Sequence, residues 1–250
     1  MGDRRVMVVT GGSRGIGAGI VLGAVADGWD VAFTYRDRED AAGAVMAAAR
    51  DVAPEARCQA FRLEVSESAD VDRAGDAVLE AFGTVHAVVA NAAVTCANLA
   101  VSTTDEEWRT VIDTNLTGAF YVVRRFLPEL LVNRWGRLIF VSSIAAHGMA
   151  GDAAYCASKA GLLGLSAALA KEYGRKGITS NTLLLSLFET DMTRQELAGE
   201  KRAFYEKHSP VGRAGQVSEV AAAVLYLASE AASFVTGQDI GVTGGLDWFH

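Results

Sequence analysis

The sequence predicts an α/β fold: one domain over residues 1–250, built on a doubly wound, seven-stranded parallel sheet with helices on both faces. Short apolar runs alternate with longer segments of helical periodicity, as in a sheet whose strands are joined by helices. The runs are apolar at successive positions, which is typical of strands buried on both faces. No linker, repeat or low-complexity segment divides the chain.

The expected strands follow one another through the whole chain. They lie at 6–10, 31–35, 58–63, 85–91, 137–143, 178–185 and 239–243. Helical periodicity is clearest at 15–27, 66–82, 104–133 and 153–175. Gly28 stands where the first of these helices should end.

Composition limits the partner and the compartment. The net charge of −7 argues against nucleic acid as a partner, because phosphate binding needs a basic face. Three widely spaced cysteines, at 58, 96 and 156, predict no disulfide framework and a reducing compartment. The histidines show no metal-ligand spacing, so we expect no metal site. No uninterrupted apolar stretch reaches the roughly 18 residues of a membrane span, so we expect a cytoplasmic protein without membrane contact.

A glycine-rich turn follows the first strand directly. The stretch TGGSRGIG, at 10–17, places Gly11, Gly15 and Gly17 where strand gives way to helix. Glycines allow a close approach of the backbone to a ligand, and the helix N-terminus offers N–H groups to a pyrophosphate. On this motif alone a plain strand–helix turn is the alternative, but the position after the first strand favours dinucleotide binding.

The end of the second strand decides between cofactors. NAD-binding sheets carry an acidic residue there for the ribose 2′-hydroxyl, whereas Tyr35 and Arg36 stand there in this chain. Arg14 lies in the glycine turn itself. Two arginines favour a 2′-phosphate, so we expect NADPH/NADP, with NAD as the alternative. Asp37 is the next residue and could neutralise Arg36.

The stretch YCASK places Tyr155 and Lys159 four residues apart in a helical segment, and hence on one face of the helix. At about 5 Å and an effective dielectric near 20, the ammonium group lowers the tyrosine pKa from about 10 to roughly 7–8. We therefore predict a tyrosine tuned by lysine to move protons at neutral pH. Such a pair on its own is usually an inert surface feature, so its neighbours matter.

Ser142 and Ser143 close the fifth strand, at the end where parallel sheets bind ligands, so a serine there can hydrogen-bond a substrate carbonyl. Asn115, in the 104–133 helix, could hold a water that feeds protons to Lys159.

With these motifs the chain resembles the compact short-chain dehydrogenases/reductases over essentially all 250 residues. NAA at 91–93 and VTGG at 242–245 complete the resemblance. It implies a Rossmann fold and a homotetramer built on the long helices. It also implies Tyr155 as proton donor and Lys159 as a ligand of the nicotinamide ribose that lowers the tyrosine pKa. A serine would polarise the carbonyl, and Asn115 would complete a proton relay.

The resemblance further implies which residues line the cofactor. They are Gly11, Ser13, Arg14, Gly15, Ile16, Gly17, Tyr35, Arg36, Glu64, Val65, Asn91, Ala92, Ala93, Tyr155, Lys159, Phe188 and Thr190. Glu64 and Val65 would lie by the adenine, and Thr190 would contact the carboxamide.

The most similar subgroup is the beta-ketoacyl-[acyl-carrier-protein] reductases with the discrete polyketide ketoreductases. Arg134 and Lys176 match basic positions that help to dock the acidic carrier protein there, so an acyl carrier protein is an expected partner. The alternative is an ordinary solvated surface.

Some positions depart from the family pattern. Leu185 and Ser186 replace the usual Pro-Gly after the sixth strand, and we expect this to loosen a substrate lid at about 187–210. Counting from Arg137 along the strand selects Ser143 as the catalytic serine, whereas the family spacing back from Tyr155 selects Ser142. Strand geometry is the stiffer guide, so we favour Ser143.

We expect NADPH-dependent reduction of a ketone to a secondary alcohol, with a beta-ketoacyl thioester of fatty acid or polyketide biosynthesis as substrate. One alternative is an NAD(P)-dependent dehydrogenase of a small or steroid-like alcohol. Another is a non-catalytic, cofactor-binding regulatory protein. The set of asparagine, serine, tyrosine and lysine argues against that last alternative, because a binding protein does not need all four.

Overall fold

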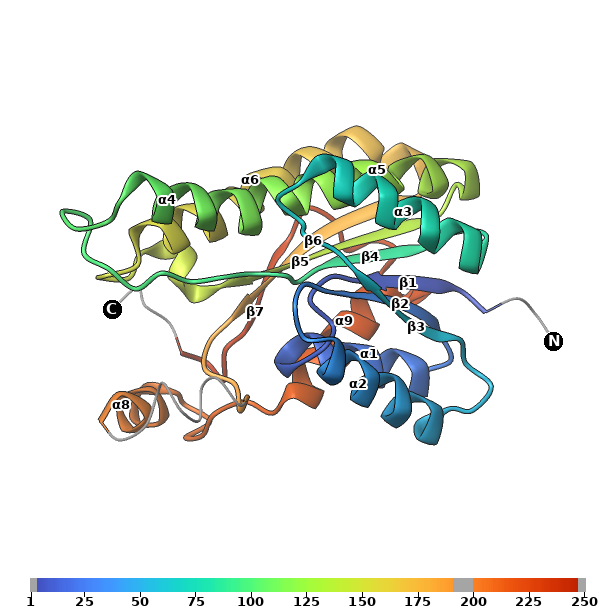
Figure 1. The fold of residues 1–250 in the computed structure, drawn as a ribbon. Coiled ribbons are helices and arrows are strands. Elements are labelled where there is room, and N and C mark those ends of the chain that lie inside the picture. Colours follow the sequence, from blue (N-terminus) through green and yellow to red (C-terminus); the bar gives the residue numbers. More distant parts are fainter. Residues whose placement is uncertain (1–3, 191–199, 247–250) are drawn as a thin grey trace.

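The fold is known from a computed structural model, which describes residues 4–190 and 200–246. Seven parallel strands form one sheet in the order β3-β2-β1-β4-β5-β6-β7 (Figure 1). They are β1 (Val6–Val9), β2 (Asp30–Tyr35), β3 (Cys58–Arg62), β4 (Ala87–Ala90), β5 (Gly136–Ser143), β6 (Ile178–Leu185) and β7 (Asp239–Val242). The predicted fold class and all seven predicted strands are confirmed. The strand order reverses between β1 and β4, and open parallel sheets bind ligands at such a point.

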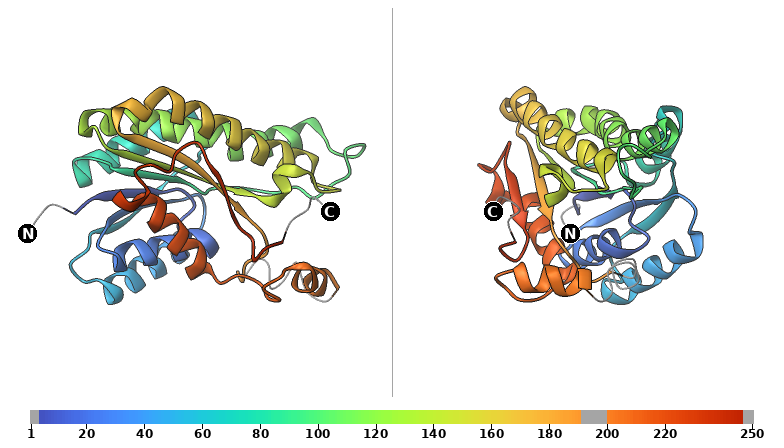
Figure 2. Two further views of the ribbon diagram at one scale, coloured as in Figure 1. Left: turned by 180° about the vertical axis from the view of Figure 1, so that it is seen from behind. Right: turned by 90° about the vertical axis from the view of Figure 1, so that its left-hand side faces the viewer.

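Helices cover both faces of the sheet (Figures 1 and 2). One face carries α1 (Gly15–Ala26), α2 (Glu39–Val52) and α9 (Val217–Ala228). The other carries α3 (Ser68–Phe82), α5 (Gly118–Asn133) and α6 (Ala153–Tyr173). Helices α4 (Asp105–Ile112) and α8 (Glu200–His208) lie past the carboxyl ends of the strands. Short turns of helix are η1 (Asp113–Thr117), η2 (Ile144–His147), η3 (Gly174–Lys176) and η4 (Glu230–Ala232).

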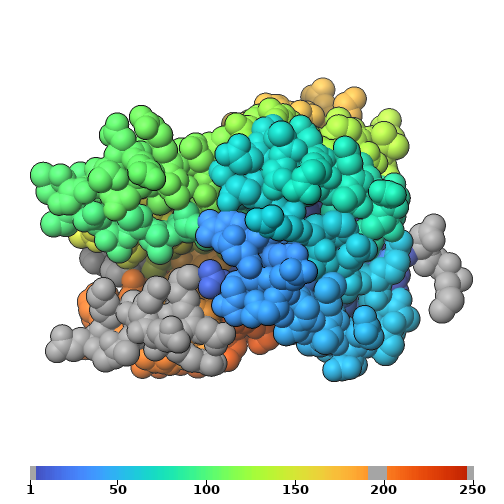
Figure 3. Space-filling view, in the orientation of Figure 1, coloured from blue at the N-terminus to red at the C-terminus, as the bar shows by residue number. Residues whose placement is uncertain are grey.

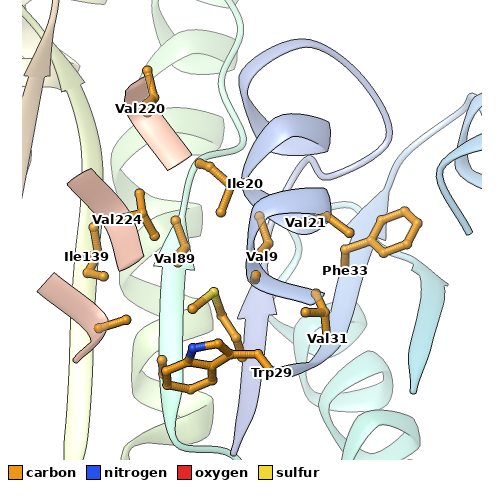
Figure 4. Packing of buried hydrophobic residues seen from close by; sticks show 14 of the residues in the cluster. Val9, Ile20, Val21, Trp29, Val31, Phe33, Val89, Ile139, Val220 and Val224 are labelled. Atoms are coloured by element: carbon orange, nitrogen blue, oxygen red, sulfur yellow. The ribbon is translucent and has the colours of Figure 1, made fainter. Parts of the chain in front are cut away.

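Two apolar clusters fix the helices to the sheet. In the first, valine and isoleucine side chains of the central strands meet those of α1 and α9 (Figure 4). Val9 and Val89 are fully buried in this layer, as are Ile20 and Val224. Each such side chain contributes about 1.5–3 kcal/mol of burial free energy, so the sheet is a firm base for the loops at its carboxyl edge.

The segment 104–133 is not the single regular helix that its periodicity predicts. Thr104 and Glu107 form a capping box at the start of α4, but residues 113–117 form a π-helix before α5 begins. The widened turn holds Asn115, which is 1% exposed. Apolar periodicity does not reveal one wider turn, and such turns are frequent at functional sites.

One helix, Ala153–Lys176, is long and apolar enough to cross a membrane by length and composition alone. It packs on the sheet instead: Ser166 on the helix hydrogen-bonds Ser180 of β6 at 2.9 Å, and Lys159 reaches β5. We therefore assign it as a core helix.

Candidate active site

The turn between β1 and α1 brings backbone N–H groups into the open. Gly11 and Gly15 have φ values of +66° and +53°, and a Cβ at Gly17 would overlap the carbonyl oxygen of Gly11. Among the described residues no side chain caps α1, whose N-cap is the exposed Arg14. Its first-turn N–H groups therefore fit a pyrophosphate. Ser13 and Ile16 are partly exposed in the same turn, and Gly12 and Gly17 are buried.

The end of β4 braces this turn. The side-chain amide of Asn91 donates to the carbonyls of Thr10 at 2.8 Å and Gly11 at 3.2 Å. The hydroxyl of Thr10 accepts from the backbone N–H groups of Asn91 and Ala92. A Cβ at Gly11 would lie 3.1 Å from the Cα of Ala92, so the two loops approach closely. Asn91 and Ala92, two of the predicted cofactor residues, thus lie beside the glycine turn.

The residues predicted for the adenosine end also come together. Arg36 forms ion pairs with Asp37 at 2.6 Å and with Glu64 at 3.9 Å. A hollow of about 660 Å³ lies at this edge, lined by Arg36, Asp37, Arg62, Glu64, Glu67, Ala69, Asp70 and Arg73. Arg62 was not predicted; its side chain donates to the backbone carbonyl of Arg36 at 3.2 Å and adds a second cation beside Arg36. Val65 is buried.

The two serines of β5 point to opposite sides, as neighbours on a strand must. The hydroxyl of Ser143 accepts from the backbone N–H of Ala145 at 3.1 Å and lies near enough to the phenol of Tyr155 to act on its pKa. The hydroxyl of Ser142 is buried and donates instead to the backbone carbonyl of Lys159 at 2.9 Å. The structure therefore brings Ser143, and not Ser142, to the tyrosine.

Lys159 does not tune Tyr155 as the Coulomb argument predicts. Its Nζ donates to the carbonyl oxygen of Val141 at 2.7 Å and lies 5.5 Å from the centroid of the Tyr155 ring. Burial lowers the pKa of Lys159 to about 8 and raises that of Tyr155 to about 12, although the nearby Ser143 hydroxyl acts in the lowering direction. The prediction was wrong for this state of the protein because it counted the attraction and left out the cost of burying both groups.

The side chain of Asn115 is fully engaged. Its oxygen accepts from the N–H of Val94 at 2.8 Å, and its nitrogen donates to the carbonyl of Val94 at 2.9 Å and to the hydroxyl of Ser158 at 3.1 Å. Ser158 in turn donates to the carbonyl of Tyr155. The amide therefore joins the β4 loop to α6, and a water held by Asn115 would have to bind its backbone carbonyl.

The loop after β6 is tied down as far as the structure follows it. Ser186 donates to the carbonyl of Thr243 at 3.0 Å, and backbone hydrogen bonds of 2.9 Å join Gly215 to Leu187 and Glu189. Residues 186–189 are therefore held by hydrogen bonds, and the loosening expected for the segment 187–210 stays a prediction; residues 191–199 lie outside the described part. The ring of Phe188 is buried against Gly215 and belongs to the core. Thr190 lies beside the glycine turn, 3.6 Å from an ideal Cβ on Gly15.

Arg134 and Lys176 are exposed and lie at the amino ends of the strands, whereas Tyr155 lies near the carboxyl ends. Arg134 follows α5 and Lys176 follows α6, so both lie where β5 and β6 begin. Helix α6 has 21 residues, which puts its far end about 30 Å from the turn that holds Tyr155. Arg134 and Lys176, which were expected to help dock a carrier protein, therefore do not border the active-site mouth of their own chain.

Two unpredicted residues, Asp152 and Tyr205, lie near Tyr155. Asp152 precedes α6 by one residue and accepts a hydrogen bond from Thr95 at 3.2 Å. The phenol of Tyr205, on α8, reaches the sulfur of Met149 at 3.8 Å. The spacing of three residues from Tyr155 could have indicated Asp152, whereas no local signal indicates Tyr205. The space-filling view shows the α4 segment, in green, projecting from this side of the molecule (Figure 3).

Known proteins resemble this chain over nearly its whole length. The family model described as Enoyl-(Acyl carrier protein) reductase matches residues 11–247. The 3-oxoacyl-[acyl-carrier-protein] reductase FabG of Salmonella typhimurium is 36% identical over 247 residues, covering 98% of each chain. That of Escherichia coli (strain K12) is 36% identical over 245 residues, with 98% of both chains covered. The crystal structure of levodione reductase superimposes with a TM-score of 0.91 at 27% identity, covering 96% of each chain.

The family assignment follows from this agreement between sequence, fold and site. A seven-stranded Rossmann-like sheet carries a glycine turn that fits a dinucleotide, with a serine, a tyrosine and a lysine at the neighbouring strand ends. The two relatives that are 36% identical over nearly their whole length are both named as reductases of a keto group. The chain belongs to the short-chain dehydrogenase/reductase family, whose nicotinamide-dependent enzymes act on CH–OH and ketone groups, and it is similar to FabG.

Proposed function

We propose that this enzyme reduces a ketone to a secondary alcohol with NADPH. The observation that carries the proposal is the proximity of the Ser143 and Tyr155 hydroxyls at the carboxyl end of β5, where Ser143 acts on the pKa of the phenol. Two hydroxyls held together in this way fit one carbonyl oxygen, with the glycine turn of the same sheet edge available for the dinucleotide.

The protein groups would supply the proton and hold the oxygen. Tyr155 has a pKa raised to about 12 by burial, so at neutral pH it carries its proton and can donate it. Ser143 would donate a hydrogen bond to the carbonyl oxygen, where negative charge develops. The cofactor supplies the hydride when it is bound. Burial lowers the pKa of Lys159 to about 8, so the lysine can supply a proton to Tyr155 after the tyrosine has donated its own. A protonated tyrosine favours reduction over the reverse oxidation, which needs a base.

We propose NADPH rather than NADH on the charges at the adenosine end. Tyr35 stands where an acidic residue would select NADH, and Arg14 and Arg36 can bind a 2′-phosphate by charge-assisted hydrogen bonds. Asp37 and Glu64 share Arg36, so the phosphate has to compete with both carboxylates. Arg14 and Arg62 add positive charge that offsets this competition.

The proposed substrate is a beta-ketoacyl thioester, by likeness to the 3-oxoacyl-[acyl-carrier-protein] reductases. A carrier protein that reaches Tyr155 would not touch Arg134 and Lys176 of the same chain. In the proposed homotetramer a neighbouring chain could present them. Free thiols at Cys58, Cys96 and Cys156 support a reducing, cytoplasmic location.

Steady-state kinetics test the function. The purified protein is assayed with NADPH and NADH against acetoacetyl thioesters, simple ketones and a steroid ketone, and in reverse with the matching alcohols. We expect NADPH-dependent reduction, with the thioester preferred. A protein that only oxidises alcohols with NAD would overturn the proposal. For the carrier, Arg134→Glu with Lys176→Glu should raise KM for a carrier-bound substrate alone; an equal effect on a small ketone would exclude docking.

A further inference from the structure

Ser158 lies on α6 between Tyr155 and Lys159, and it is fully buried. Its hydroxyl donates to the backbone carbonyl of Tyr155 at 2.7 Å, three residues earlier in the helix. A serine hydroxyl carries a single proton, and this bond uses it. Toward any further partner the oxygen of Ser158 can therefore only accept.

The further partner is the side-chain amide of Asn115, which is 1% exposed. The amide oxygen accepts from the N–H of Val94 and the amide nitrogen donates to the carbonyl of Val94. Because a backbone N–H can only donate and a carbonyl can only accept, these two bonds fix which end of the amide is the nitrogen. The second proton of that nitrogen goes to the oxygen of Ser158, at 3.1 Å.

The same face of α6 receives the π-helix η1 that carries Asn115. Gly161 follows Ser158 by three residues and therefore lies on this face. A Cβ at Gly161 would come within 2.6 Å of Cδ2 of Leu116, the next residue of η1. The π-helix thus packs closely on α6 at Gly161 and is hydrogen-bonded to it at Ser158, so a shift of one element is passed to the other.

We propose that Ser158 is a positioning residue, which couples Asn115 to the turn of α6 that carries Tyr155 and Lys159. This inference rests on the proposed ketoreductase function and adds a residue that supports its geometry. Without the oxygen of Ser158, the amide of Asn115 would keep a buried proton without an acceptor, which is unfavourable enough to make the amide turn or move. A displacement of about 1 Å at a reacting group can cost about 100-fold in rate, so a small movement of the Tyr155 turn would be seen in kcat.

The test compares two buried serines of the same helix. Ser166 is 1% exposed and forms a hydrogen bond with Ser180 at 2.9 Å, about 12 Å further along α6, so Ser166→Ala removes a similar bond away from the site. Both Ser158→Ala and Ser166→Ala should melt about 2–4 °C below the wild type. Only Ser158→Ala should lower kcat for an acetoacetyl thioester, by about 10- to 100-fold, with KM and NADPH affinity close to those of the wild type.

A double-mutant cycle with Asn115→Ala shows whether Ser158 acts through this amide. In the Asn115→Ala protein the further change Ser158→Ala should cost little in kcat, because the proton that needs the acceptor is no longer there. Single losses that simply multiply in the double variant would overturn the role of Ser158. So would a Ser158→Ala protein with the kcat of Ser166→Ala, and in both cases the ketoreductase function would stand.

Amide hydrogen exchange on the wild type tests the network without a substitution, which matters if Ser158→Ala does not fold. The side-chain amide protons of Asn115 should exchange far more slowly than those of Gln59, which is exposed on β3. Equal exchange rates would overturn the network and with it the role of Ser158. A wild type that reduces no ketone would overturn the proposed function itself.

Discussion

The positions of Ser142 and Ser143 lead to a sharp prediction from two neighbouring residues. Ser143→Ala removes the hydroxyl that lies near Tyr155 and would donate to the substrate oxygen. Loss of one such donor costs about 100- to 1000-fold in kcat. Ser142→Ala removes a buried hydrogen bond to the backbone of α6 and should cost about 1 kcal/mol of stability, or a Tm lower by about 2–4 °C, with little loss of activity.

Both variants are assayed with NADPH and an acetoacetyl thioester, and both are melted by circular dichroism. The expected result is an inactive Ser143→Ala protein of nearly normal Tm beside an active Ser142→Ala protein of lower Tm. A large loss of kcat in Ser142→Ala with normal turnover in Ser143→Ala would refute the assignment and the strand-alternation argument behind it.

Further predictions concern the lysine, the cofactor and the core. Between about pH 8 and pH 10.5 the unfolded protein still holds the proton of Lys159, whereas the folded protein has released it. The free energy of unfolding of the wild type should therefore rise with pH across this window by about 3 kcal/mol relative to that of Lys159→Met. Denaturant titrations of both proteins that show the same pH dependence would contradict this. The double variant Arg14→Ala, Arg36→Asp should prefer NADH, because each arginine–phosphate contact that it loses contributes about 1.5–3 kcal/mol. A wild type that uses NADH and NADPH equally well would contradict this. Phe188→Ala should lower the free energy of unfolding in urea by about 3 kcal/mol, because the ring is buried. An unchanged midpoint of urea unfolding would contradict a core role and favour the predicted contact of Phe188 with the cofactor.

The strands of the sheet and the choice of Ser143 could be predicted because both follow from the local pattern of the sequence. Strands β1, β2 and β4 are buried at nearly every position and appear as short apolar runs, whereas the edge strands β3 and β7 are partly exposed. The alternation of side chains along β5 chose Ser143 over Ser142. Asn115 was found by its motif, but the π-helix that aims its amide at Val94 leaves no trace in the apolar pattern.

What the sequence could not supply depends on burial and on distances through space. The pKa prediction for Tyr155 failed because desolvation is set by the whole fold and not by one neighbour four residues away. Arg134 and Lys176 were predicted to help dock a carrier protein, yet the sheet topology puts them at the amino edge of the strands, away from Tyr155. Tyr205 comes to the site from 50 residues beyond Tyr155 in the sequence, with no spacing rule to indicate it.

Tyr155→Phe tests the central claim most directly, because it removes one oxygen and keeps the ring that packs at the start of α6. NADPH binding is measured by fluorescence titration, and reduction of an acetoacetyl thioester is measured on the same sample. We predict NADPH affinity close to that of the wild type, with turnover lower by about 100-fold to 10,000-fold, the range for loss of a positioned acid. Turnover near that of the wild type would remove Tyr155 from the mechanism and contradict the account.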